Sequence, residues 1–104
     1  MKRSSKTVLK EPEESWHQLF KAISVIESAE EANQFFEDLC TPTEIQAMAD
    51  RWRVVPLVKA GIPYRKIYEL THVSVTTIGR VARYLAQGKG YHLIYERFLK
   101  KAQL

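Results

Sequence analysis

The sequence predicts an all-α protein of six helices, two of which form a helix-turn-helix. Apolar residues recur three and four positions apart in six successive segments, a spacing that aligns side chains on one face of a helix. Residues that cap helices begin several of these segments, and glycines separate some of them from the next. No segment is predicted to be a strand.

Length and composition indicate one folded domain. A chain of 104 residues has no room for two hydrophobic cores, and its 45% hydrophobic content is typical of globular proteins. We expect residues 1–11 to form a flexible basic tail and residues 12–104 to form the domain. No apolar run approaches the ~20 residues that span a bilayer. The single cysteine, Cys40, suits a reducing compartment, so the predicted location is the cytoplasm.

The first two predicted helices carry many aromatic side chains. The first helix covers residues 12–27, and Ser28 and Glu31 have the spacing of a capping box that opens the second. The apolar faces consist of Trp16, Leu19, Phe20, Ile23 and Ile26 in the first helix and Ala32, Phe35, Phe36 and Leu39 in the second. One short chain has little room to bury these rings, so we expect a partner subunit to cover them. The alternative is that they form the core of a monomer.

A long third helix is predicted from residue 42 to residue 60. Thr41 stands at the cap position, and a proline and a glutamate follow at the first and third helical positions. Pro56 lies inside this helix and predicts a kink, because proline has no N–H to donate to the carbonyl four residues before it. Gly61 is expected to end the helix.

Residues 63–85 are predicted to form the helix-turn-helix. Pro63 stands near the first turn of its first helix, Ser74 caps its second helix, and the short connection between them requires a steep crossing. The apolar stripes are Ile67 and Leu70 in the first helix and Ile78, Val81, Ala82 and Leu85 in the second. After residues 88–90, a last helix is predicted from Tyr91 to about Gln103.

Small, hydroxylic and basic residues on this motif predict DNA binding. Such side chains can enter a major groove and contact base edges and phosphates. The predicted DNA-binding residues are Arg65, Lys66, Val75, Thr76, Thr77, Arg80 and Arg83. The charge distribution favours the same function, because residues 11–49 hold nine acidic and one basic residue, whereas residues 50–104 hold three acidic and eleven basic ones. The alternatives are an ordinary helical hairpin and solvated helix faces that differ in sign.

No pattern in the sequence is typical of an enzyme. The three histidines are far apart and lack the spacing of metal ligands, and there is no glycine-rich phosphate loop. We therefore predict no catalytic residue, no metal site and no cofactor.

Two segments carry a resemblance to a known family. The segment from Leu39 to Val55 resembles the third helix of the Trp repressor, and the segment from Val75 to Arg80 is similar to its recognition helix. The likeness is closer to the small Trp-repressor-like proteins of the YerC/YecD type and extends over about residues 16–100. It implies an interlocked, all-helical homodimer that represses transcription when an amino-acid corepressor orders its DNA-reading parts.

The resemblance also implies roles for single residues. Arg65 corresponds to an arginine that contacts a guanine or a phosphate, and Arg51 and Arg80 correspond to two arginines beside the corepressor. Thr41, with Asp38 and Cys40, corresponds to a segment that the partner subunit contributes to the pocket. The implied effector-binding residues are Arg51, Arg80, Thr41, Val81 and Tyr84.

Three departures from the family pattern affect these expectations. His72 stands where a turn glycine is usual, and it can adopt a positive φ at some cost in free energy. Val81 and Tyr84 replace smaller residues near the corepressor ring, so we expect tryptophan to be excluded and any effector to be smaller or of another shape.

The sequence as a whole predicts a sequence-specific repressor that binds double-stranded DNA as a homodimer. We expect it to control an amino-acid biosynthesis or transport operon and to respond to an amino acid. One alternative is a DNA-binding protein without an effector, its pocket filled by Val81 and Tyr84. Another is a protein-interaction adaptor whose acidic N-terminal half docks on a basic partner.

Overall fold

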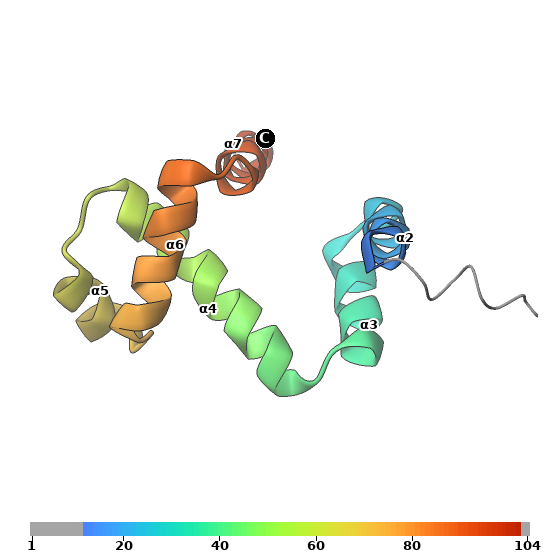
Figure 1. The fold of residues 1–104 in the computed structure, drawn as a ribbon, viewed down its shortest axis with the longest axis horizontal. Helices are drawn as coiled ribbons and strands as arrows, with labels where there is room; N and C mark the ends of the chain where they lie inside the picture. Colours follow the sequence, from blue (N-terminus) through green and yellow to red (C-terminus); the bar gives the residue numbers. More distant parts are fainter. Residues whose placement is uncertain (1–11, 103–104) are drawn as a thin grey trace, which may run out of the picture. The chain divides into compact units, whose positions relative to one another are not determined.

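The computed structural model describes residues 12–102, so the predicted basic tail lies outside the described residues. Six helices and no strand occur in this range, which confirms the all-α fold class (Figure 1). The helices are α2 (Pro12–Ser24), α3 (Ala29–Leu39), α4 (Pro42–Lys59), α5 (Tyr64–Thr71), α6 (Val75–Gln87) and α7 (Gly90–Ala102). They divide into a first unit with α2 and α3 and a second unit with α4 to α7. A single domain over residues 12–104 stays a prediction.

The connection between α2 and α3 has the predicted capping box. The Ser28 hydroxyl accepts a hydrogen bond from the backbone N–H of Glu31 at 3.1 Å. The Glu31 carboxylate accepts one from the backbone N–H of Glu27 at 2.9 Å. α2 ends at Ser24, three residues earlier than predicted, because the next two N–H groups bond three residues back in a tightened last turn.

Gly61 ends α4 as the sequence predicted. Its φ is 78°, its N–H donates to the carbonyl of Val58 at 3.0 Å, and the N–H of Ile62 donates to the carbonyl of Leu57 at 3.2 Å. These two bonds form a Schellman motif, which requires a left-handed residue at the position of the glycine. α4 continues through Pro56 as one helix, and a kink there stays a prediction.

The core of the second unit lies around α6. This helix packs against α4, α5 and α7, with α5 near its N-terminal end and α7 following its C-terminal end (Figure 1). The buried residues are Val54, Val55, Ile67, Val73, Ile78, Val81 and Leu85. The prediction that Leu70 belongs to the apolar stripe is wrong, since its side chain is 55% exposed. The chain leaves α5 at Thr71, and the turn residue Val73 is buried with Ile67 instead.

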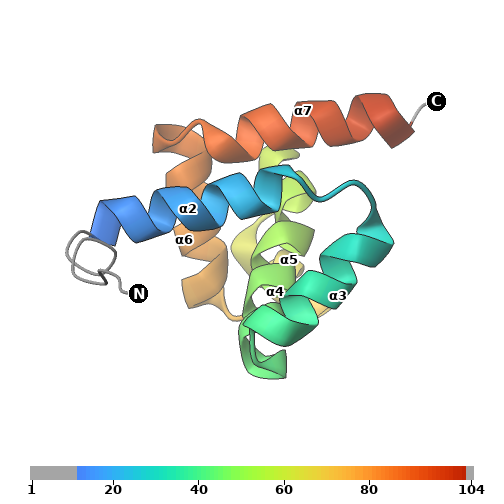
Figure 2. The ribbon, with the colours of Figure 1, turned by 90° about the vertical axis from the view of Figure 1, so that its right-hand side faces the viewer.

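Aromatic and polar contacts hold α7 to the rest of the second unit. Figure 2 shows the ribbon from a second direction. The rings of Trp52 and Tyr95 meet edge to face with 6.0 Å between their centroids. The His92 ring bridges two helices, because Nε2 lies 2.6 Å from the carbonyl oxygen of Leu85 and Nδ1 lies 3.1 Å from Nζ of Lys59. A carbonyl can only accept, so Nε2 carries the proton and Nδ1 accepts from the ammonium group.

Candidate nucleic-acid interface

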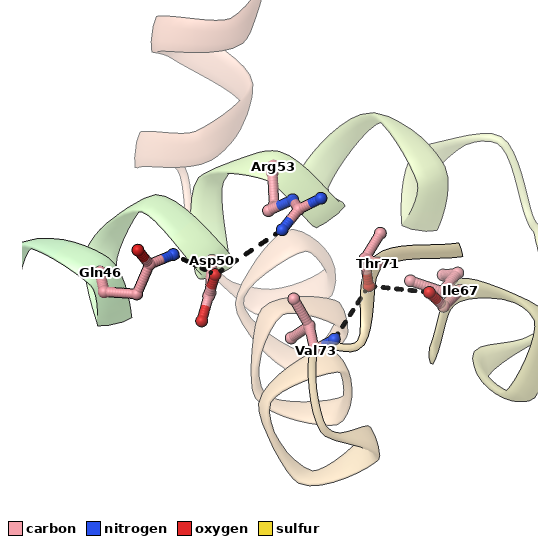
Figure 3. A network of polar contacts seen from close by, with 6 residues as sticks. All are labelled: Gln46, Asp50, Arg53, Ile67, Thr71 and Val73. Atoms are coloured by element: carbon pink, nitrogen blue, oxygen red, sulfur yellow. Dashed lines mark hydrogen bonds and ion pairs between the residues drawn. The ribbon is translucent and has the colours of Figure 1, made fainter. Parts of the chain in front are cut away.

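Hydrogen bonds between residues close in sequence stabilise the turn of the helix-turn-helix. The Thr71 hydroxyl donates to the carbonyl of Ile67 at 2.8 Å and accepts from the N–H of Val73 at 3.1 Å (Figure 3). His72 has a φ of 62°, and its N–H donates to the carbonyl of Tyr68 at 2.7 Å. The left-handed conformation considered for His72 is therefore confirmed. An edge-to-face contact with the Tyr68 ring, 6.0 Å between centroids, accompanies it.

The first turn of α6 contains the three residues predicted to read bases. The Ser74 hydroxyl caps this turn by accepting from the N–H of Thr77 at 3.1 Å, and it donates to the Thr77 hydroxyl at 3.1 Å. Thr77 is half-buried and takes part in the cap, whereas Val75 and Thr76 are exposed. Two of the three side chains are thus exposed, and the Thr77 hydroxyl acts as an acceptor toward Ser74, which leaves its own proton to donate elsewhere.

Arg80 and Arg83 share an aromatic neighbour on α6. The guanidinium carbon of Arg80 lies 5.0 Å from the centroid of the Tyr84 ring, and that of Arg83 lies 5.7 Å from it. Both distances are within the range of a cation–π interaction. The sequence analysis missed this cluster, although the spacing of Arg80 and Tyr84, four residues apart on one helix, is a signal that could have found it.

The basic side chains of the motif remain available for phosphates. Arg65, Lys66, Arg80 and Arg83 are exposed, and none of them forms an ion pair with another described residue. Arg65 and Lys66 lie on α5, and the other two lie on α6. The motif therefore carries four positive charges that no described carboxylate neutralises.

The residues predicted to bind an effector differ in exposure and belong to both units. Val81 is 0% exposed in the core, so in the described chain its side chain offers no surface to a ligand. Arg51 is half-buried on α4, and Arg80 and Tyr84 are exposed on α6. Thr41 belongs to the first unit, whereas the other four belong to the second.

An apolar pocket that the sequence analysis missed lies beside Tyr84. Its volume is about 480 Å³, and it is lined by Trp52, Tyr84, Gly88, Gly90, Tyr91 and Ile94. Gly88 allows the chain to pass closely over α6, because a Cβ atom there would lie 2.9 Å from the carbonyl oxygen of Tyr84. The sequence signal that could have indicated this pocket is the pair Gly88 and Gly90, which lies between two tyrosines that also line it, Tyr84 and Tyr91.

Other kinds of site find no support in the part of the chain that the structure describes. No group of three or more His, Cys, Asp or Glu residues in that part could hold a metal ion. None of the described helices combines the length and the apolar character that a membrane crossing requires.

A helix-turn-helix with an open first turn on its second helix and uncompensated cations defines a class of DNA-binding transcription regulators. Within this class, the chain belongs to the Trp repressor family, because the family described as Trp repressor protein matches residues 14–102. The family is one of regulators and not of enzymes.

Similar proteins agree with this assignment. The chain is 41% identical over 81 residues to a Bacillus subtilis (strain 168) protein named "Uncharacterized protein YerC", a match that covers 77% of this chain and 78% of that protein. The crystal structure of a TrpR-like protein from Eubacterium eligens ATCC 27750 superposes with a TM-score of 0.75 at 37% identity, covering 89% of this chain and 95% of that one. The family resemblance and the six-helix fold predicted from the sequence are confirmed, whereas the interlocking of two subunits stays a prediction.

Proposed function

We propose that this protein is a transcriptional repressor that binds a pseudo-palindromic operator as a homodimer, with half-sites about 34 Å apart. The observation that carries the proposal is the exposed first turn of α6, a helix whose opposite face packs into the hydrophobic core. Four cations of the motif form no ion pair within the described residues. A helix presented in this way can enter the major groove while arginines and lysines bind phosphates. Membership of the Trp repressor family supports the same function.

Unburied apolar side chains support the homodimer. Trp16 and Phe20 of α2 are 61% and 59% exposed, and no residue of α3 is buried. In the second unit, α7 exposes Leu93, Ile94, Phe98 and Leu99. Removing apolar surface from water contributes roughly 25 cal/mol per Å², so covering these side chains favours association. In the proposed dimer, the outer helices of the two subunits interlock and cover them.

The finer part of the proposal is that an amino acid regulates DNA binding and that the regulated genes serve amino-acid biosynthesis or transport. We also propose that the protein acts in the cytoplasm. Arg51 and Arg80 support it, because a guanidinium group can bind a carboxylate through two parallel hydrogen bonds. Neither forms an ion pair with a described residue.

The second candidate is a DNA-binding regulator without an effector. The complete burial of Val81 favours it, since a side chain that the core covers offers no surface to an effector. The contact between Arg80 and the Tyr84 ring favours it as well, because it holds one of the two proposed carboxylate-binding groups against an aromatic ring.

Selection of bound fragments from random DNA, with and without a mixture of amino acids, tests the proposal. We expect an inverted-repeat motif and an affinity whose logarithm falls linearly with the logarithm of the salt concentration. A motif that binds more or less tightly with amino acids present supports the effector, and an unchanged affinity supports the second candidate. An adaptor that uses its acidic N-terminal half to dock on a basic protein would enrich no DNA motif.

A further inference from the structure

Glu69 is an unusual charge on the DNA-binding motif. It is one of only three acidic residues after position 49. Asp50 is engaged on α4, where its carboxylate accepts from the Gln46 amide at 2.9 Å and lies 4.0 Å from the Arg53 guanidinium (Figure 3). Glu69 is exposed on α5 and has no ion pair with a described residue. A carboxylate without an ion pair repels phosphates. If the motif binds DNA, we therefore expect Glu69 to contact a group other than a phosphate.

The surroundings of Glu69 indicate which contact that is. A pocket of about 310 Å³ is lined by Arg65, Tyr68 and Glu69 of α5 and by Val75, the first residue of α6. Val75 begins the turn that would enter the major groove, and it is 53% exposed. Arg65 and Glu69 stand one helical turn apart and form no ion pair with each other. A hydrogen-bond donor and a hydrogen-bond acceptor therefore line the same pocket beside the predicted base-reading turn.

This combination is complementary to the major-groove edge of a G·C base pair. Guanine offers two acceptors there, O6 and N7, and cytosine offers one donor, its N4 amino group. The Arg65 guanidinium can donate to guanine, and a carboxylate such as that of Glu69 can only accept. Thymine presents an acceptor and a methyl group at this edge, so a carboxylate disfavours it.

We propose that Arg65 and Glu69 together read one G·C base pair in each half-site, with Glu69 accepting a hydrogen bond from cytosine N4. The inference rests on the proposed function, because it requires the first turn of α6 to lie in the major groove. It makes Glu69 a specificity-determining residue that raises discrimination between sequences while lowering affinity for DNA in general.

Two duplexes distinguish this role from a structural one: the selected operator and a random sequence of equal length. Binding of the full-length protein is measured for the wild type, Glu69→Ala, Glu69→Gln and the control Glu96→Gln, which removes the same charge from α7. We expect Glu69→Ala to bind the operator about five- to tenfold more weakly. It should bind the random duplex at least as tightly as the wild type, because it has lost a negative charge. Glu69→Gln should relax the preference for cytosine over thymine at one position, because an amide can donate to thymine O4 as well as accept from cytosine N4. Glu96→Gln should keep every base preference.

An equal effect of Glu69→Ala on both duplexes, or a selected motif identical to that of the wild type, would overturn the inference. Circular dichroism of each variant shows whether the helices are intact. If the alanine variant folds poorly, Glu69→Gln replaces it in the test, because the glutamine side chain has nearly the same shape as glutamate. The double variant Arg65→Ala/Glu69→Ala should lose less than the product of the two single losses, since both residues read the same base pair. A wild-type protein that enriches no motif at all would contradict the proposed function, whereas a motif unaffected at Glu69 would contradict this inference alone.

Discussion

The Tyr84 ring lies close to the guanidinium groups of both arginines of α6. A free arginine side chain carries about 2 kcal/mol of rotamer entropy that is lost when it binds. Contacts of 5.0 and 5.7 Å with one ring restrict both guanidinium groups before DNA arrives. The side of each guanidinium group that faces away from the ring remains free to donate to a phosphate. We therefore expect Tyr84, which also lines the apolar pocket, to act as a positioning residue for DNA binding.

We expect Tyr84→Leu to weaken operator binding about fivefold, since each exposed cation–π contact contributes roughly 0.5–1 kcal/mol. The slope of affinity against salt should not change, because the number of phosphates contacted stays the same. The matched control is Tyr84→Phe, which keeps the ring and should bind like the wild type. Fluorescence anisotropy at several salt concentrations measures both quantities. If phenylalanine and leucine at this position weaken binding equally, the ring does not position the arginines.

At the residue scale, the sequence predicted which side chains are exposed on the motif better than it predicted their partners. Exposure of Val75, Thr76, Arg80 and Arg83 follows from helical periodicity, because the opposite face of α6 is apolar. The same periodicity places Val81 in the core, although the family resemblance also implied a ligand contact for it. The stack on Tyr84 depends on side-chain rotamers, which periodicity does not determine.

At the scale of helices, the ends were predictable wherever a local hydrogen bond defines them. Ser28, Ser74 and Gly61 act as caps within four residues of their partners, so a short sequence window contains the whole interaction. The role of Val73 was not predictable in this way. Its burial beside Ile67 depends on the direction in which the chain leaves α5, and that direction follows from the left-handed residue His72.

The glycine that ends α4 gives a prediction about stability. A Cβ atom at Gly61 would meet nothing within 4 Å, so space does not explain the glycine, but its φ of +78° is strained for other residues. We expect Gly61→Ala to lower the free energy of unfolding by about 1–2 kcal/mol. Gly90→Ala is the control, because Gly90 also has open space and lies in helix α7. Urea denaturation should show little change or a small gain for Gly90→Ala, and equal losses in both variants would rule out the backbone explanation.

At the scale of the whole molecule, the sequence predicted an excess of apolar side chains outside the core, but not which surface covers them. The buried core residues all belong to the second unit, whereas the described residues of α2 and α3 are exposed or half-buried. A helix with an apolar face and no core of its own needs another surface. Helical periodicity identifies the apolar face, but it does not identify the surface that covers this face.

Trp16 allows the homodimer to be tested with one substitution. In the single chain this side chain is 61% exposed, so a monomer should tolerate Trp16→Glu with little change in stability. In an interlocked dimer the ring is covered by the partner, and the substitution should cost about 2–4 kcal/mol and lower the melting temperature by roughly 10 °C or more. His17→Glu is the control, because it places the same charge on the neighbouring exposed position of α2.

The melting temperature of the wild type should also rise with protein concentration, because in an interlocked dimer unfolding and dissociation are one event. A melting temperature independent of concentration, together with a Trp16→Glu variant as stable as the His17→Glu control, would show that the chain folds as a monomer.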